Sequence, residues 1–129
     1  MIEEIQYTVD FIASFLITSK LNIPMTIIYK FKRDLINELI FHYKNHWFEN
    51  EPSRNRNFRS LLFSHHIDYL VLKAWSTTKL NIRVANLIFP INLQIFCDPK
   101  KVSYNFHNKE YILFKKDFDS SFNLSYLPE

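Results

Sequence analysis

The chain has 129 residues, a formal net charge of +3, a single cysteine and no glycine. The lack of glycine excludes glycine-rich phosphate loops and dinucleotide-binding fingerprints, and the single cysteine excludes an internal disulfide. Hydrophobic residues make up 47% of the chain and aromatic residues 17%, which favours a folded domain over disorder. The mild positive charge permits RNA or an acidic protein surface as a partner and demonstrates neither.

The first half of the chain is predicted to form two helices. Apolar residues at spacings of four, three and four predict a helix over about residues 2–19. A second helix is expected to have Pro24 in its first turn, with Asn22 or Ile23 just before it, and to end near Trp47, because proline is suited to the first turn of a helix. The apolar positions are Ile5, Val9, Ile12 and Leu16 in the first helix, and Ile28, Phe31, Leu35 and Leu39 in the second.

The middle of the chain alternates between polar and structured segments. Residues 49–57 are polar apart from Pro52 and predict a loop, and residues 58–63 predict a short strand. Asp68 is placed to cap a third helix. Asn81 is placed to cap a fourth, which ends near Phe89 ahead of Pro90.

Three strands are expected to close the domain, over about residues 91–97, 102–107 and 110–115. Asn108-Lys109 is the predicted tight turn between the last two strands, and turns that need a positive φ should fall mainly to asparagine. Helices followed by strands predict an α+β fold, with four to five helices on one side of a four-stranded, mainly antiparallel sheet. We predict one domain over residues 1–117 and a short C-terminal extension over 118–129.

The composition also bears on the cellular compartment. The chain begins with an acidic segment, Met1-Ile2-Glu3-Glu4, which is unlike a signal peptide. The longest uncharged runs are too short to span a membrane. We therefore expect a soluble protein, and the single cysteine suits a reducing compartment.

The segment from Ile91 to Pro99 alternates between apolar and polar residues, as a strand with one wet face does. Phe96 falls on the polar face of this strand, beside Asp98. A large ring there is typical of a partner-binding anchor, although a loop or helix that covers the ring is an equally good explanation. Cys97 falls on the inward face, which favours a buried hydrophobe over a nucleophile.

Catalytic and metal-binding patterns are weak. His42 and His46 have a spacing that could place both on one metal, with His65 and His66 as further ligands. No glutamate follows His42 as in the zinc-peptidase pattern, and structural roles explain these histidines more simply. We therefore predict no enzyme activity, catalytic residue, metal or cofactor.

A basic loop gives an alternative function. Arg54, Arg56 and Arg59 surround Phe58, and arginines interleaved with an aromatic ring are typical of surfaces that bind single-stranded RNA. A solvated loop is the simpler interpretation of the same residues.

Two segments resemble the boxes of a known family. The first, His42-Tyr43-Lys44-Asn45-His46-Trp47-Phe48 with Pro52, Phe58-Arg59 and Asp68 after it, is similar to box A of the BTG/Tob family of antiproliferative adaptors. The second, from Pro90 to Tyr104, resembles box B, whose pattern ends in Asp-Pro-x-x-Val-Ser-Tyr. The opening residues also look like the first helix of that family, so the resemblance spans almost the whole chain.

The resemblance implies a non-enzymatic adaptor of the cytoplasm and nucleus. Members bind the catalytic deadenylase subunit of the CCR–NOT complex, which shortens mRNA poly(A) tails, and so influence mRNA decay and proliferation. The protein-binding residues carried over by position are Phe58, Asp68, Phe96 and Asp98, with Pro99 fixing the adjacent turn. Poly(A)-binding protein and transcription factors are further candidate partners. Tob-type relatives recruit poly(A)-binding protein through a long tail, and because the sequence stops at Glu129 we expect this second activity to be less favoured than deadenylase binding.

The chain departs from the family pattern at several of these positions. Phe96 stands where tryptophan is usual and Phe58 where tyrosine is usual, so an indole N–H and a hydroxyl are lost. Asn55-Arg56-Asn57 replaces expected glycines, and Lys100-Lys101 replaces a common aromatic–acid pair. We expect these changes to affect affinity and choice of partner more than the fold.

Overall fold

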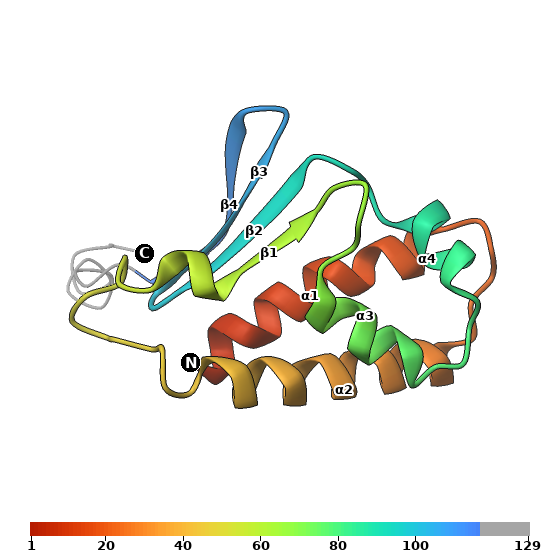
Figure 1. Ribbon diagram of the computed structural model, residues 1–129, viewed down its shortest axis with the longest axis horizontal. Helices are drawn as coiled ribbons and strands as arrows, with labels where there is room; N and C mark the ends of the chain where they lie inside the picture. Colours follow the sequence, from red (N-terminus) through yellow and green to blue (C-terminus); the bar gives the residue numbers. More distant parts are fainter. Residues whose placement is uncertain (117–129) are drawn as a thin grey trace, which may run out of the picture.

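Two long helices and a curved sheet organise the chain, whose computed structural model describes residues 1–116 (Figure 1). The predicted extension, residues 118–129, lies outside the described residues. No helix within residues 1–116 has both the length and the apolar character needed to cross a membrane. The elements follow in the order α1 (Ile2–Thr18), α2 (Met25–Tyr43), the 3₁₀ helix η1 (Arg56–Arg59), β1 (Ser60–Phe63), α3 (Tyr69–Ser76), α4 (Ile82–Ile88), β2 (Leu93–Asp98), β3 (Lys101–Phe106) and β4 (Lys109–Lys115).

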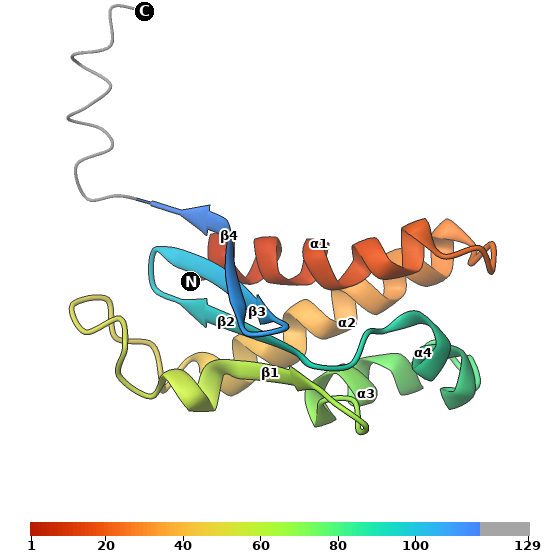
Figure 2. The ribbon, with the colours of Figure 1, turned by 90° about the horizontal axis from the view of Figure 1, so that it is seen from above.

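The four strands pair in sequence order, and every pair is antiparallel. Ser60 of β1 lies opposite Phe96 of β2, which in turn lies opposite Ser103 of β3. The β3–β4 pairing contains a register shift next to Ser103. Both strands pack against α1 (Figure 2), where Tyr104 stacks on Phe11 and Phe114 stacks on Tyr7 at centroid distances of 4.4 and 4.5 Å. The predicted α+β architecture, with helices backing one antiparallel sheet, is confirmed.

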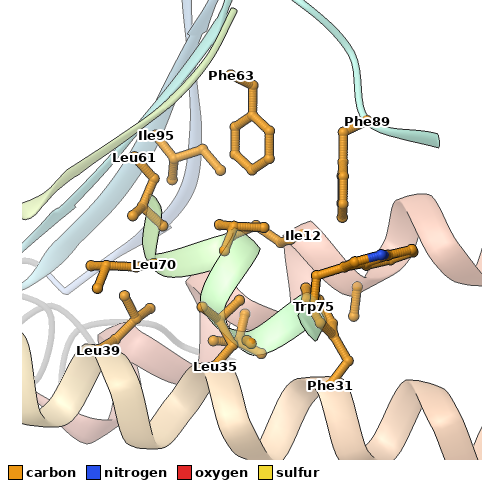
Figure 3. Close-up of a cluster of buried hydrophobic side chains, with 14 of the residues drawn as sticks. Ile12, Phe31, Leu35, Leu39, Leu61, Phe63, Leu70, Trp75, Phe89 and Ile95 are labelled. Carbon is orange, nitrogen blue, oxygen red and sulfur yellow. The ribbon is translucent and has the colours of Figure 1, made fainter. Parts of the chain in front are cut away.

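The hydrophobic core lies between the helices and the inner face of the sheet (Figure 3). All eight predicted apolar positions of α1 and α2 belong to it, each at most 1% exposed. Leu61 of β1 and Ile95 of β2 close the core from the sheet side. Trp75 of α3 meets Phe31 of α2 edge to face, with ring centroids 5.8 Å apart. Each such buried side chain stabilises the fold by about 1.5–3 kcal/mol, which holds β1 and β2 in a fixed orientation.

Because side chains alternate along a strand, the residues between these core positions point to the outer face of the sheet. On β2 these are Gln94, Phe96 and Asp98, and on β1 they include Leu62, which is 47% exposed. The structure thus confirms the predicted alternation from Leu93 to Asp98. It does not hold for the two residues before, because β2 begins at Leu93 and not at Ile91, which is 50% exposed.

Both predicted helix caps are confirmed. The Asp68 carboxylate accepts a hydrogen bond of 3.0 Å from the backbone N–H of Leu70 at the start of α3. The Asn81 side chain accepts one of 2.8 Å from the N–H of Arg83 at the start of α4. These bonds satisfy donors that a helix start leaves unpaired.

Several predicted boundaries differ from the structure by one to a few residues. Helix α2 ends at Tyr43 and not near Trp47, because the buried Tyr43 hydroxyl donates to the Arg59 carbonyl (2.8 Å) and the chain then turns into the loop. Strand β1 begins at Ser60 because η1 occupies the preceding residues. The last hairpin turns at His107 and Asn108, whose φ values of 52° and 63° suit a two-residue turn.

Candidate functional site

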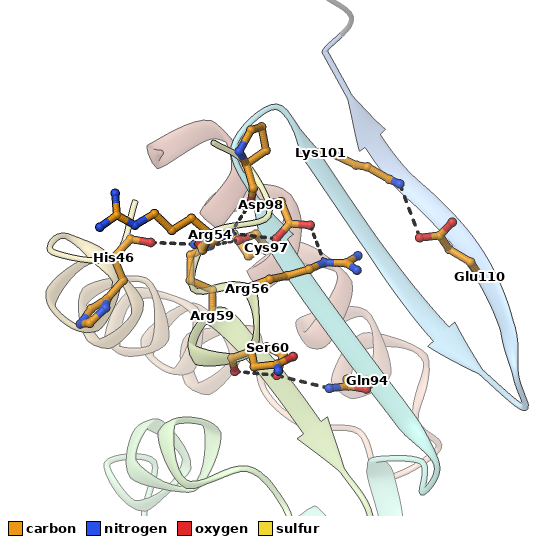
Figure 4. A network of polar contacts seen from close by, with 12 residues as sticks. His46, Arg54, Arg56, Arg59, Ser60, Gln94, Cys97, Asp98, Lys101 and Glu110 are labelled. Atoms are coloured by element: carbon orange, nitrogen blue, oxygen red, sulfur yellow. Dashed lines mark hydrogen bonds and ion pairs between the residues drawn. The ribbon is translucent and has the colours of Figure 1, made fainter. Parts of the chain in front are cut away.

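Two stretches of sequence that are distant along the chain meet where β1 begins and β2 ends. Strand β1 pairs with β2 along its length, so η1, which directly precedes β1, lies beside the C-terminal end of β2. Arg56 and Arg59 of η1 both form ion pairs with Asp98 of β2, at 2.9 and 3.0 Å (Figure 4). The two boxes recognised in the sequence therefore form one structural unit.

Arg59 is the centre of this unit. Its side chain is fully buried, and each of its five N–H groups donates a hydrogen bond. One bond goes to Asp98 and four go to backbone carbonyl groups at 2.6–2.9 Å, so a single side chain fixes the loop between α2 and β1. The carbonyl groups are those of His46, Pro52, Arg54 and Cys97.

Asp98 supplies the charge that the buried arginine requires. One carboxylate oxygen accepts from Nη2 of Arg59 and the other from Nε of Arg56, and the residue is only 6% exposed. The sequence predicts Asp98 as an acid available to a partner, and this prediction of an available acid is wrong. A buried guanidinium is stable only beside a counter-charge, and Asp98 provides it.

Phe96 lies on the outer face as predicted, but it is not an exposed ring. The residue is 7% exposed, and the guanidinium carbon of Arg56 lies 3.8 Å from the centroid of its ring. The interpretation that a neighbouring segment covers the ring is therefore confirmed. Strand alternation alone could not identify the covering group, since Arg56 precedes Phe96 by 40 residues.

Phe58 of η1 is the ring that does reach solvent, with 41% of its surface exposed. It stacks against two imidazoles, those of His42 and His46, at centroid distances of 4.3 and 3.7 Å. Burial and the neighbouring His46 hold the pKa of His42 below its usual value. The spacing of the two histidines thus has a structural explanation, which is the support of an exposed aromatic ring.

Asp68 joins β1 to α3. Besides capping the helix it accepts a hydrogen bond of 3.2 Å from the backbone N–H of Leu62. Burial raises the pKa of Asp68 above its ordinary value, in spite of these bonds. Its contact with a partner stays a prediction, whereas its two bonds within the domain give it a role in the fold.

Pro99 lies in the turn between β2 and β3 and is buried. The next residue, Lys100, has a φ of 68°, and its backbone N–H donates to the Glu4 carboxylate at 2.8 Å. The predicted role of Pro99 in fixing the turn is consistent with this position. Its contact with a partner stays a prediction.

The RNA-binding alternative loses part of its basis. Arg59 was one of its three arginines, and this assignment is wrong because Arg59 is buried with every donor used. Arg54 forms an ion pair with Glu51 at 3.0 Å, and its guanidinium lies 4.0 Å from the centroid of the Phe48 ring. Of the three arginines, Arg56 lies on the outer face of the sheet, over the ring of Phe96.

Reactive groups are scarce in the described part of the chain. Burial raises the pKa of the Cys97 thiol to about 12, so the cysteine is the buried hydrophobe that its strand position predicts. Within residues 1–116, no group of three or more histidine, cysteine, aspartate or glutamate side chains could hold a metal ion.

These features define an α+β domain whose helical layer leaves the outer face of the sheet uncovered, with an arginine–carboxylate cluster and an exposed ring at one end. The chain belongs to the BTG family, whose family model matches residues 1–115. It is 33% identical over 104 residues to the BTG1 proteins of Homo sapiens and Bos taurus, a match that covers 81% of this chain and 60% of theirs. The BTG2 protein of Homo sapiens is 30% identical over 104 residues, with 81% of this chain and 65% of that protein covered.

A solved structure shows the same fold. The BTG/Tob domain of C. elegans FOG-3 superposes with a TM-score of 0.81 at 20% sequence identity, over 96% of this chain and 98% of that one. The match to the BTG1 proteins covers less than two thirds of their length.

Proposed function

We propose that this protein is an adaptor that binds the catalytic deadenylase subunit of the CCR–NOT complex and thereby modulates poly(A)-tail shortening in the cytoplasm and nucleus. Membership of the BTG family and the likeness of both boxes support this function. Poly(A)-binding protein and transcription factors are further partners that an adaptor of this kind could connect to the deadenylase.

The observation that carries the proposal is the contact between the two boxes. The ion pairs of Arg56 and Arg59 with Asp98 join residues that lie 42 and 39 positions apart in the chain. The same short helix, η1, holds Arg56 over Phe96 and exposes Phe58. One docking surface can therefore include residues of both boxes. If the two boxes had separate roles, this contact between them would not be needed.

The structure suggests a division of roles among the predicted contact residues. Phe58 offers an exposed ring, which is the type of side chain that anchors protein interfaces. Asp98 acts behind the surface, where it holds Arg56 and Arg59 in place. Asp68 fixes the connection from β1 to α3 by accepting one hydrogen bond from each of the two elements.

Phe58→Ala is the variant that tests this function most directly. Because Phe58 is partly exposed, its truncation should leave the fold largely intact while it removes anchor area. We expect binding to the deadenylase catalytic subunit of the same organism, measured by titration calorimetry, to weaken about ten- to a hundredfold. Tyr29→Ala is the matched control, since Tyr29 is 61% exposed and lies about 20 Å from His42 along α2.

Two outcomes would contradict the proposal. The first is a folded wild-type protein that does not bind the deadenylase at micromolar concentrations. The second is an equal effect of Phe58→Ala and Tyr29→Ala on the affinity, which would place the contact elsewhere on the molecule. Asp98→Ala is a poor probe, because it leaves the buried Arg59 without its counter-charge.

A further inference from the structure

A hollow of about 210 Å³ opens on the outer face of the sheet, next to Arg56. The Pro52–Ser53 segment of the loop, Arg56 and the Asp98–Pro99 turn line one side of it, and Lys101 and Glu110 line the other. Figure 4 shows Arg56 lying across β2 with its terminal nitrogens on the side of the sheet where Lys101 and Glu110 pair.

Arg56 is held in place without using its terminal donors. Asp98 binds Nε at 2.9 Å, and the Phe96 ring supports the flat face of the guanidinium at 3.8 Å. Within residues 1–116 neither Nη atom has a hydrogen-bond partner, and 35% of the side chain is exposed. A guanidinium that is stacked, fixed at Nε and unoccupied at its Nη fork is already arranged to bind a planar anion with two parallel hydrogen bonds.

The charges around the hollow favour a singly charged anion. Arg56, Lys101 and the buried Arg59 are balanced against the carboxylates of Asp98 and Glu110, which leaves one positive charge in excess. A dianionic phosphate would be repelled by the nearby carboxylates of Asp98 and Glu110. A singly charged carboxylate from a ligand would match the one positive charge in excess.

We propose that this hollow receives an acidic side chain of the partner protein, with the Arg56 Nη fork as the group that binds its carboxylate. The inference rests on the proposed function for the identity of the partner, the deadenylase. It reverses the charge expected at this point of the surface: the sequence predicts that Asp98 offers a negative charge, and the structure presents a positive one in front of it.

The first experiment tests the hollow without the deadenylase. Acetyl-(Glu)₃-amide is titrated into ¹⁵N-labelled protein, and the signals of the Arg56 Nε–H and the Ser53 N–H are followed. We expect saturable shifts in the wild type, their loss in Arg56→Gln, and their persistence in Arg54→Gln. Arg54 is the matched control because it is an arginine of the same loop, paired with Glu51 and absent from the lining of the hollow.

The second experiment uses the deadenylase. We expect Arg56→Gln to weaken binding about tenfold or more, Arg56→Lys to restore it only in part because lysine lacks the fork, and Arg54→Gln to leave it unchanged. Thermal unfolding of each variant shows that the fold is kept.

The two experiments separate the inference from the proposed function. Peptide binding without deadenylase binding would refute the deadenylase as partner and leave the acid-binding hollow standing. Absence of peptide shifts in the wild type would overturn the inference whatever the deadenylase does. Tighter binding of the deadenylase by Arg56→Ala than by the wild type would also overturn it, because Arg56 would then have to move away from Phe96 before the partner binds. Tighter binding of a phosphoserine peptide than of the glutamate peptide would overturn it as well.

Discussion

Each of the five donors of the buried Arg59 side chain has an acceptor, but only one of these acceptors carries a negative charge. The stability of the buried guanidinium therefore depends strongly on Asp98. Removal of one partner of a buried ion pair leaves an uncompensated charge, which typically costs about 3–5 kcal/mol. We expect Asp98→Ala to lower the free energy of unfolding by an amount in this range, measured by urea denaturation. Glu110→Gln removes a partner from a surface pair with Lys101 and should change stability by less than about 1 kcal/mol. Equal stability of the two variants would contradict this account of Arg59.

His42 makes stability depend on pH near neutrality. Burial and the charge of His46 lower its pKa in the folded protein, against smaller opposite effects of Asp68 and Glu38. His42 therefore takes up a proton more readily in the unfolded chain than in the folded one. The free energy of unfolding decreases as pH falls from about 6.5 towards the lower pKa of His42 in the folded protein.

The test compares the urea midpoint of the wild type with that of His42→Gln between pH 7.5 and 5.5. The wild type should lose more stability on acidification than the variant does. Equal slopes would show that other groups dominate the pH dependence and would contradict this role of His42.

At the scale of single residues, local patterns predict which face of a strand a side chain is on better than they predict which groups surround it. The alternation of β2 places Phe96 and Asp98 correctly on the outer face and Cys97 inside. It cannot show that Arg56, 40 residues earlier in the chain, covers the ring and takes up the carboxylate. The exposed group of the site was therefore missed, and only the long-range pairing of β1 with β2 identifies it.

At the scale of elements, Glu4 connects α1 to the turn between β2 and β3. Burial alone would raise its pKa, but the hydrogen bond from the Lys100 N–H contributes to a net lowering, so the carboxylate stays ionised. We expect Glu4→Gln to reduce stability by about 1–3 kcal/mol, with the exposed Glu3→Gln as control. The stability from Glu4 is present above about pH 4.5 and is lost as pH falls through its lower folded pKa.

Differential scanning calorimetry at pH 7 and pH 3.5 would measure this contribution. The difference between Glu4→Gln and the wild type should shrink at the lower pH, because below about pH 4.5 the unfolded chain takes up a proton that the folded Glu4 carboxylate resists. A difference of the same size at both pH values would show that the charge of Glu4 is not what stabilises the contact.

Helices were easier to predict than the loop because their signals are local. The apolar positions of α1 and α2, and the caps Asp68 and Asn81, are set by residues within a few positions of each other. The early end of α2 depends on Tyr43, whose hydroxyl binds a residue 16 positions later. Turn chemistry was predicted in outline: four of the seven residues with positive φ in the described part of the chain are asparagines.

At the scale of the whole molecule, the pattern of hydrophobic residues was sufficient for the fold class but not for the order of the strands. Two helical stripes and three alternating segments leave few arrangements in which all apolar faces are buried, and the observed one is an antiparallel sheet on a helical layer. The proposed docking surface is different, because it consists of contacts between charged and aromatic groups from distant segments. Such contacts follow from the fold and leave no periodic signal in the sequence.

The acceptors of Arg59 also set an order of events when the chain is made. Two of them, the Cys97 carbonyl and the Asp98 carboxylate, lie 38 and 39 residues further along the chain. A ribosome-bound fragment that stops before β2 lacks both of these acceptors, so its Arg59 has neither the Cys97 carbonyl nor the counter-charge of Asp98. The cluster that joins the two boxes can therefore be completed only after β2 has been synthesised.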